Sequence, residues 1–428
     1  NVLNLKFPYC VFTAGGSYFI IGALMGWPAP TLKKLRASDT PIRLSVLEES
    51  WVVNALYLTT MVSPFMCGAL MNSFGRKLTL LGLTVFPTLS WILVFFSRSS
   101  AMLIAARFLA GFWVGGCTTV VPIYVAEIAE PAVRGVVGTF AVVSTILGII
   151  SAYVIGPCVS VYTMAAINVV TPVLFFALFS LCPESPYFYV MRDQHVAAAA
   201  VLTWLRARDS VTSELAAIQG SVERDAQTRQ GCLRRLFIHF LFDRMSGFSC
   251  LMAYSSVILP SKVGPFTSDN CTLIMGIVWL GSALICSILA DRVGRKPLLY
   301  LSSIGIFVSM LSTSLWLNWV PLAGVLIFGL TYTMGLGAIP LIYQGEMFPS
   351  GLKGIGSALT VGVCAGSSAL SVSVFAVLVK FVGLYAPFLL FAAVGPVTFL
   401  FVYYFVMETK GKSLQAIQDE LRGEELDR

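Results

Sequence analysis

Charged residues are scarce in this chain. Only 11% of its 428 residues are Asp, Glu, Lys or Arg, whereas 57% are hydrophobic, and the mean hydropathy is +0.84. A soluble protein of this size needs far more charge to cover its surface. The scarcity of charge therefore argues against a soluble fold and indicates a chain that lies mostly in lipid.

Histidine is scarcer still, with two residues. The sequence has no His-Glu-x-x-His metal motif, no Gly-x-Ser-x-Gly nucleophile motif and no P-loop. Its ten cysteines show no Cys-x-x-Cys spacing, so neither a metal cluster nor a disulfide framework is indicated. We therefore expect no enzymatic activity and no cofactor.

Acidic residues are fewer than basic ones, 21 against 28, which gives a formal net charge of +7. The basic residues lie in loops between apolar stretches, where phospholipid headgroups are the nearest partners. We expect a lipid bilayer, and not a nucleic acid, as the partner of this charge.

Long apolar stretches are abundant. A membrane-spanning helix needs about 20 apolar residues, and nothing at the start resembles a signal peptide, so the first stretch is predicted to be a retained helix. An even number of spans places both termini on one side of the membrane. The twelve predicted spans are residues 8–30, 50–71, 78–97, 101–124, 136–157, 161–182, 235–260, 267–290, 298–318, 320–345, 354–380 and 384–407.

The sequence repeats itself at an offset of 219 residues (291 minus 72). The string NSFGRK, which starts at Asn72, returns as DRVGRK, which starts at Asp291. Agreement at so many charged and glycine positions is improbable in a chain this poor in charge, so we infer two homologous six-helix halves related by an axis along the membrane normal. The same offset aligns Tyr124 with Tyr343, Glu127 with Glu346, Arg134 with Lys353 and Gly135 with Gly354.

The halves are separated by a polar stretch in which charged and apolar residues alternate, as in amphipathic helices on a membrane face. We therefore predict an all-α membrane protein with two pseudo-symmetric bundles. Its divisions are an N-terminal bundle (1–183), an intracellular helical linker (184–234), a C-terminal bundle (235–407) and a cytoplasmic tail (408–428).

The short basic loops predict the orientation. By the positive-inside rule, the repeated Gly-Arg-Lys loops and both termini face the cytoplasm. The sequon that begins at Asn270 then lies outside, which predicts a glycoprotein. One signal opposes this orientation, because the first loop, which the topology places outside, also contains basic residues, namely Lys33, Lys34, Arg36 and Arg43.

Charged residues at the helix ends of the basic loops suggest ion-pair latches. Carboxylates and cations that meet only when the halves close on the inside would stabilise the outward-open state. The alternative is that these residues are solvated anchors at the headgroups. Arg107 lies within an apolar stretch and is predicted to face the protein interior and to have a partner there. The predicted latch residues are Arg76, Lys77, Glu127, Arg134, Glu184, Asp291, Arg292, Arg295, Lys296, Glu346, Lys353 and Glu408.

Several strings resemble the sugar porter family of the major facilitator superfamily: NSFGRK, ARFLAGFWVGG, VPIYVAEIAEPAVRG, PESPYF, DRVGRK, GLGAIPLIYQGEMFP and METKGKSL. The strings GALMGWPAP and ESW are similar to its insect trehalose and sugar transporter branch. The resemblance implies alternating access between two rigid bundles, with a small solute bound near the bilayer midplane. It also implies a multi-pass protein of the plasma membrane that works as a monomer.

The pocket departs from that family, because most of the amide side chains that the family directs at sugar hydroxyls are replaced. A buried hydroxyl without a partner costs about 1 to 3 kcal/mol. One hypothesis is therefore a cargo less polar than a hexose, or a charged one. The alternative is a sugar whose hydroxyls are met by other groups, such as Gln344. The candidate pocket residues are Val142, Asp243, Arg244, Ser246, Ser249, Tyr254, Trp279, Leu341, Cys364, Ala365 and Ser368.

The sequence also leaves open whether transport is coupled to the movement of a proton. His239 and Asp243 are four residues apart and share a helix face, so they could relay a proton. In the resemblance, however, proton-coupled members have an acidic residue at the position of Ala23, which favours facilitated diffusion. A nutrient sensor that has lost transport is the alternative from a different functional class.

Overall fold

The computed structural model describes the greater part of the chain. The described residues are 6–36, 42–129, 134–207, 211–225, 245–259, 262–263, 266–315, 320–337, 339, 353–406, 408 and 410. Side chains are described for all of these except residues 134–139, 221–225, 262–263, 287–288, 290–291 and 353–355.

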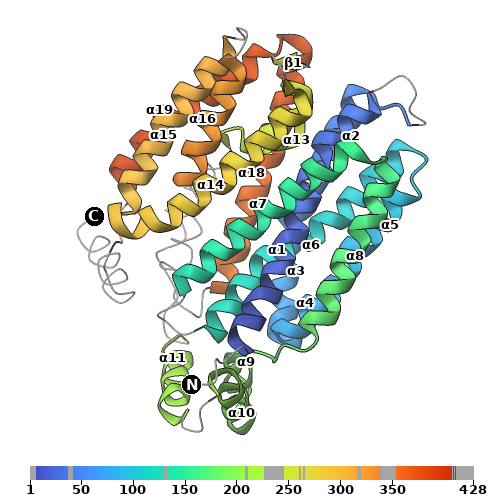
Figure 1. Ribbon diagram of the computed structural model, residues 1–428. Helices are drawn as coiled ribbons and strands as arrows, with labels where there is room; N and C mark the ends of the chain where they lie inside the picture. The colour runs from blue at the N-terminus through green and yellow to red at the C-terminus, as the bar shows by residue number, and fades with distance from the viewer. Residues whose placement is uncertain are drawn as a thin grey trace.

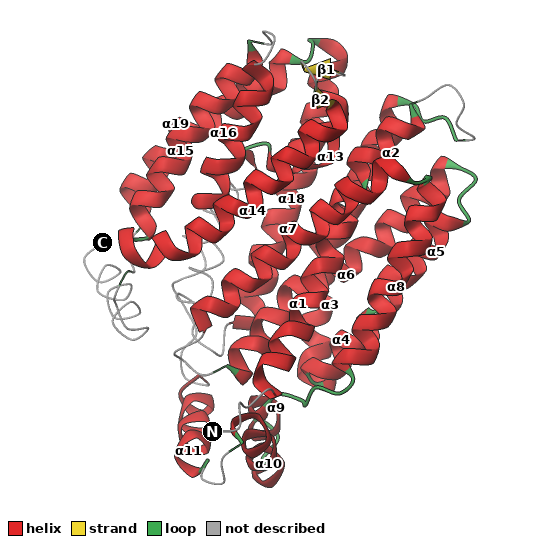
Figure 2. Ribbon diagram, in the orientation of Figure 1, coloured by secondary structure: helices red, strands yellow, loops and turns green. Residues whose placement is uncertain are grey.

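The N-terminal half is a bundle of long apolar helices (Figures 1 and 2). Three short helices of the predicted linker lie together beyond one end of this bundle. The helices of the bundle are α1 (Lys6–Gly26), α2 (Pro28–Leu35), α3 (Val46–Phe74), α4 (Arg76–Leu83), α5 (Val85–Phe95), α6 (Ser100–Ile128), α7 (Arg134–Cys158) and α8 (Val161–Phe179); those of the linker are α9 (Pro186–Val190), α10 (His195–Arg206) and α11 (Thr212–Asp225).

The C-terminal half is a second bundle beside the first (Figure 1). Its strands, the only ones among the described residues, form a short antiparallel hairpin in which Lys262 pairs with Thr267. The elements of this half are α13 (Phe248–Ile258), β1 (Lys262–Val263), β2 (Phe266–Thr267), α14 (Ser268–Val293), α15 (Arg295–Ser314), α16 (Val320–Met334), α18 (Lys353–Phe381) and α19 (Tyr385–Phe405).

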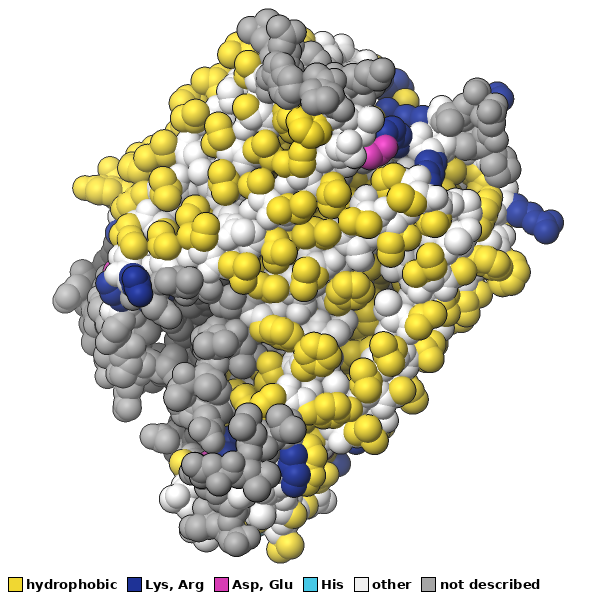
Figure 3. Space-filling view, in the orientation of Figure 1, with side chains coloured by type: hydrophobic (Ala, Val, Ile, Leu, Met, Phe, Trp, Pro, Cys, Tyr) yellow, Lys and Arg dark blue, Asp and Glu magenta, His cyan; other side chains and the backbone are white. Residues whose placement is uncertain are grey.

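The helices match the predicted spans. Ten helical segments of the described chain are long and apolar enough to cross a membrane, and the shorter apolar helices α13 and α16 lie in the other two predicted stretches. Figure 3 shows hydrophobic side chains spread over this face of both bundles, with Lys and Arg at its edges. Large apolar side chains such as Phe12 and Val170 are more than half exposed, as expected for helices that face lipid. The prediction of an all-α membrane protein is confirmed.

Proline breaks the first helix, and an arginine compensates. Pro28 has no N–H, so the carbonyl of Leu24, four residues earlier, loses its usual helical donor. Arg107 of α6 supplies a replacement, because its Nη1 donates to the Leu24 carbonyl at 2.6 Å and its Nε to the Val52 carbonyl at 3.1 Å. The prediction that Arg107 faces the protein interior matches this position, and its partners are backbone carbonyls of α1 and α3.

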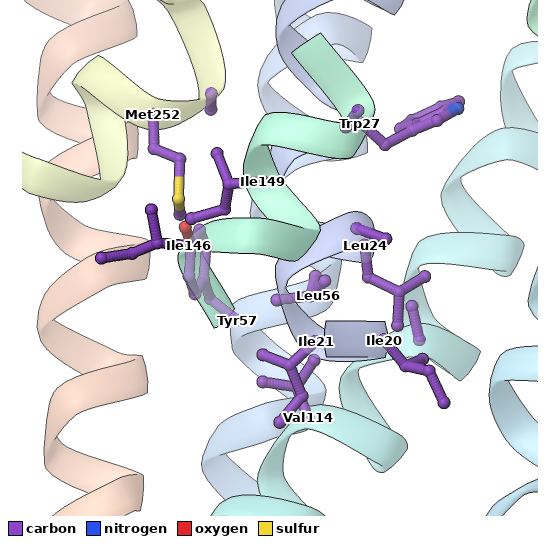
Figure 4. Packing of buried hydrophobic residues seen from close by; sticks show 14 of the residues in the cluster. Ile20, Ile21, Leu24, Trp27, Leu56, Tyr57, Val114, Ile146, Ile149 and Met252 are labelled. Carbon is purple, nitrogen blue, oxygen red and sulfur yellow. The ribbon is translucent and has the colours of Figure 1, made fainter. Parts of the chain in front are cut away.

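Glycines allow the helices of the N-terminal half to pack closely. A Cβ on Gly22 of α1 would lie 1.9 Å from the carbonyl oxygen of Thr145, and a Cβ on Gly148 of α7 would lie 2.1 Å from that of Phe19. The backbones of α1 and α7 therefore touch. Figure 4 shows buried side chains near this contact; the labelled ones come from α1, the junction between α1 and α2 (Trp27), α3, α6, α7 and, from the other half, α13 (Met252).

Candidate functional site

The predicted N-terminal latch is an ion pair between α4 and α6. Arg76 Nη2 donates to Glu127 Oε1 at 2.8 Å, and both side chains are largely buried, with 5% and 12% of their surface exposed. Arg76 also lies over the ring of Phe188 in α9, with 5.8 Å between the guanidinium carbon and the ring centroid. The pair therefore links the ends of α4 and α6 that lie nearest the linker to α9 of the linker.

Glu184 closes the turn between α3 and α4. Its two carboxylate oxygens accept hydrogen bonds from the backbone N–H groups of Arg76 at 3.0 Å and Lys77 at 2.9 Å. Gly75 has φ +92°, and a Cβ there would lie 2.3 Å from Glu184 Oε2, so only glycine lets the carboxylate approach. Burial raises the pKa of Glu184, although the backbone N–H groups and Arg76 oppose that rise.

Glu408 repeats this arrangement in the C-terminal half. It accepts from the backbone N–H groups of Arg295 at 3.0 Å and Lys296 at 2.9 Å. Gly294 of the same turn has φ +107°, and its Cβ would lie 2.8 Å from Glu408 Oε2. Burial acts to raise the pKa of Glu408, but three backbone N–H groups and the charge of Arg295 outweigh it, so the pKa lies below its usual value.

Glu184 and Glu408 make equivalent hydrogen bonds to the Gly-Arg-Lys turns of their own halves. The 219-residue repeat of the sequence, however, does not align them. Glu184 and Glu408 are 224 residues apart (408 minus 184), five more than the offset of the Gly-Arg-Lys loops. A comparison at one fixed register therefore does not align them. The equivalence follows only from the hydrogen bonds that each carboxylate makes.

The described latch contacts lie within each half and do not join the halves. Pairing across the halves at this end remains a prediction. Arg292 is exposed, and its carbonyl accepts from Lys410 Nζ at 2.5 Å. Glu346 lies outside the described residues, as do the side chains of Arg134, Asp291 and Lys353.

A linker residue that the sequence did not single out as a site also binds the end of α6 at Ile128. Arg206 of α10 donates to the carbonyl of Ile128 at 2.9 Å and pairs with Glu214 of α11 at 2.6 Å. In the sequence, Arg206 was marked only as one of the charged residues that alternate with apolar ones in the linker. The contact holds two linker helices against the N-terminal bundle.

Two candidate pocket residues bond to each other. Ser249 of α13 donates to Ser368 of α18 at 2.9 Å, and Ser368 donates to the carbonyl of Cys364 at 2.8 Å. Both serines are buried, as are Ser246 and Ala365, whereas Cys364 is half-buried. The hydroxyls of Ser249 and Ser368 are therefore engaged within the protein in this conformation.

The other described candidates are mostly aromatic or apolar. Trp279 of α14 is fully buried, with its ring centroid 5.0 Å from that of Phe248, and it packs against Gly329 of α16. Tyr254 stacks on Phe375 with a centroid distance of 5.3 Å. Val142 is half-buried on α7. The candidates His239, Asp243, Arg244 and Leu341, together with the alternative Gln344, lie outside the described residues.

Hydrogen bonds join the two halves at the end opposite the linker. Lys33 of α2 donates to Asp269 of α14 at 2.6 Å and to Ser268 at 2.7 Å. Further bonds cross between α3 and α18, where Asn54 donates to Ser373 at 3.0 Å, and between α7 and α13, where Tyr153 donates to the carbonyl of Met252 at 3.1 Å. The sequence alone does not single out Asn54 or Asp269, because their partners are more than 200 residues away.

Asn270, the candidate glycosylation site, is exposed in the first turn of α14. Its sequon partner Thr272 is buried and donates to the carbonyl of Ser268 at 2.9 Å. Glycosylation remains a prediction.

Comparisons with known proteins agree with this geometry. Residues 10–421 match the sequence profile of the family described as "Sugar (and other) transporter". Proteins described as "Facilitated trehalose transporter Tret1" are 28% identical to the chain: the one from Polypedilum vanderplanki over 94% of this chain and 86% of its own length, and the one from Bombyx mori over 94% and 84%.

Solved structures share the fold. The proton:xylose symporter XylE bound to 6-bromo-6-deoxy-D-glucose superposes with a TM-score of 0.84 at 20% identity, over 97% of this chain and 99% of that one. A partially occluded inward-open conformation of XylE from E. coli also gives 0.84, at 19% identity, over 95% and 99%.

Proposed function

Because the chain belongs to the sugar (and other) transporter family, we propose that it carries a small carbohydrate across a membrane by facilitated diffusion, through alternating access between its two bundles. The duplicated carboxylate contact is the observation that carries the proposal. Glu184 and Glu408 each anchor one Gly-Arg-Lys turn at the inner end of a bundle. Each half thus moves as a unit whose inner helix ends are tied together.

The proposal of a carbohydrate cargo rests on the relatives, which are described as facilitated trehalose transporters and match 94% of this chain. The described chain also offers one amide between the halves. Asn54 is 6% exposed, and its Oδ1 accepts no hydrogen bond from the described residues. Such an acceptor suits a hydroxyl-rich solute.

Facilitated diffusion is favoured over proton coupling by the surroundings of α1. Ala23, which takes the place of the acid in proton-coupled members, is buried in the N-terminal bundle. Glu49, a buried carboxylate near the outer end of α3, is held by Arg36 at 2.5 Å. Glu49 therefore belongs to a structural ion pair and lies on α3, not on α1.

A less polar cargo is the second candidate, and the pocket favours it. Ser249 and Ser368 are engaged with each other, and the candidate positions Trp279 and Ala365 have no amide side chain. A polyol would have to break the serine pair to gain a partner. An apolar solute would leave that pair intact.

Purified protein in proteoliposomes separates these candidates. Uptake of labelled glucose, fructose and trehalose is compared with that of apolar and carboxylate-bearing solutes of similar size, with and without a proton gradient. We expect uptake of a sugar at a rate that collapsing the gradient does not change. Uptake of only the less polar or anionic solutes contradicts the carbohydrate cargo, and a rate that falls with the gradient contradicts facilitated diffusion.

The remaining parts of the proposal concern the setting of the protein. We place it in the plasma membrane as a monomer, with both termini and α9–α11 on the cytoplasmic side. The basic Gly-Arg-Lys turns lie at the same end as α9–α11, which agrees with the positive-inside rule.

A further inference from the structure

Three of the four cations that opposed the predicted orientation lie in the short helix α2 or directly after it. Arg36, directly after it, pairs with Glu49 of α3, and Lys34 donates to the carbonyls of Gly156 and Val159 at the end of α7. Lys33 is bound as well, but to the other half. These three cations are therefore used as structural ties, which explains their presence on the side of the membrane where the positive-inside rule does not expect them.

Lys33 differs from its neighbours because its partners belong to the C-terminal half. Its Nζ lies 2.6 Å from Asp269 Oδ2 and 2.7 Å from Ser268 Oγ, both in the first turn of α14. It is the one ion pair between the halves in the part of the chain that the structure describes. The side chains of Lys33 and Asp269 are 40% and 26% exposed, so the pair is only partly buried.

Two further bonds between the halves lie deeper than this pair. The hydroxyl of Tyr153, five residues before the end of α7, donates to the Met252 carbonyl, and Asn54, eight residues into α3, donates to Ser373. With about 1.5 Å per helical residue, these contacts lie roughly 8 and 12 Å below the helix ends. The outer end is thus closed over more than one layer, with the charged pair at its entrance.

We propose that Lys33 and Asp269 form an outer latch, which closes the solute path at the end opposite the linker and sets how often that end opens. The inference rests on the alternating access of the proposed function. When the bundles part at this end, α2 must leave α14, so the pair exists only in the closed state. A contact made in one state alone shifts the equilibrium toward that state.

The expected effect is moderate because the pair is partly exposed. Exposed pairs typically shift an equilibrium by roughly two- to five-fold. Loss of either charge should therefore raise the population open at this end by a factor in that range. High salt should weaken the latch of the unmodified protein in the same direction.

The test measures the distance across the outer mouth with spin labels on cysteines introduced at Val46 and Leu315. These residues are exposed at the outer ends of α3 and α15, one in each half. The variants are Lys33→Met, Asp269→Asn and the charge swap Lys33→Asp with Asp269→Lys. Lys34→Met is the matched control, because its bonds remain within the N-terminal half.

We expect the long-distance population to grow in Lys33→Met and in Asp269→Asn. It should return to the level of the unmodified protein in the charge swap and stay unchanged in Lys34→Met. Equal shifts for Lys33→Met and Lys34→Met, or no shift for Asp269→Asn, overturn the latch. The label distance needs no transported solute, so a failed latch is distinguishable from a wrong cargo. A misfolded variant is recognised by its loss of the unmodified distance distribution altogether, and the salt titration of the unmodified protein then decides the proposal.

Discussion

Arg107 donates from its Nη1 to the backbone carbonyl of Leu24 at 2.6 Å, and this carbonyl is the one that Pro28 leaves without a helical donor. The side chain is buried and also lies over the Trp27 ring, with 5.4 Å between the guanidinium carbon and the ring centroid. A charge from α6 therefore stabilises the break between α1 and α2, the helix that contains the proposed outer latch.

We predict that Arg107→Met lowers thermal stability, because an unpaired buried carbonyl costs about 1 to 3 kcal/mol. In a Pro28→Ala background the restored N–H can satisfy the Leu24 carbonyl, so the same substitution should cost less. Melting temperatures of the two single variants and the double variant measure this coupling. An equal cost in both backgrounds would show that Arg107 acts in some other way.

Glu184 and Glu408 should respond to pH with opposite signs. Folding raises the pKa of Glu184 from about 4.5, so its contribution to stability is present at low pH and falls as the pH rises through the raised value. Folding lowers the pKa of Glu408, so its contribution is present above about pH 4.5 and is lost as the pH falls through the lowered value.

We therefore predict that the melting temperature of Glu184→Gln improves relative to the unmodified protein as the pH rises from about 3 to 7, whereas that of Glu408→Gln worsens. The difference between each variant and the unmodified protein is measured across this range. Slopes of the same sign would contradict the assignment of the two carboxylates to different environments.

The turn at Gly75 should not tolerate a side chain. Gly75→Ala places a Cβ 2.3 Å from Glu184 Oε2 at a φ of +92°, so we expect a loss of about 1 kcal/mol or more and a displaced carboxylate. Gly82→Ala is the control, since nothing lies within 4 Å of its Cβ in α4, and it should be neutral or stabilising. Unchanged melting and uptake in Gly75→Ala would count against the role of this turn.

The contact between α1 and α7 should be equally sensitive. In Gly148→Ala the new methyl group would lie 2.1 Å from the Phe19 carbonyl oxygen, which forces the helices apart. We expect a loss of about 1 to 3 kcal/mol, measured by melting, together with reduced uptake. Gly16→Ala in α1 meets only Phe175 at 3.6 Å and should leave both quantities nearly unchanged.

Val142→Gln tests the carbohydrate cargo. It places an amide at a half-buried position of α7 that is one of the candidate pocket residues. If the cargo is a sugar, one added hydrogen bond of about 0.5 to 1.5 kcal/mol should lower the KM for uptake by roughly two- to ten-fold. Val143→Gln is the control. Its side chain, at the next half-buried position, points about 100° away, so it should not lower the KM. A higher KM in Val142→Gln would favour the less polar cargo.

The sequence by itself determined the number of spanning stretches, the duplication and the Gly-Arg-Lys turns. These features depend on neighbouring residues, because a span requires about 20 consecutive apolar residues and a turn at positive φ favours a glycine. The same reasoning predicted that Arg107 faces the interior, because a charge in an apolar stretch has few other places to lie.

Only the tertiary structure decided which groups meet. Glu408 bonds the turn after Gly294, Arg107 bonds the carbonyl left free by Pro28, Ser249 bonds Ser368, and Lys33 bonds Asp269. Each contact joins helices that are distant in the chain, and its existence depends on helix crossing and rotation. Those quantities are set by close backbone packing, as at Gly22 and Gly148, and no single stretch of sequence records them.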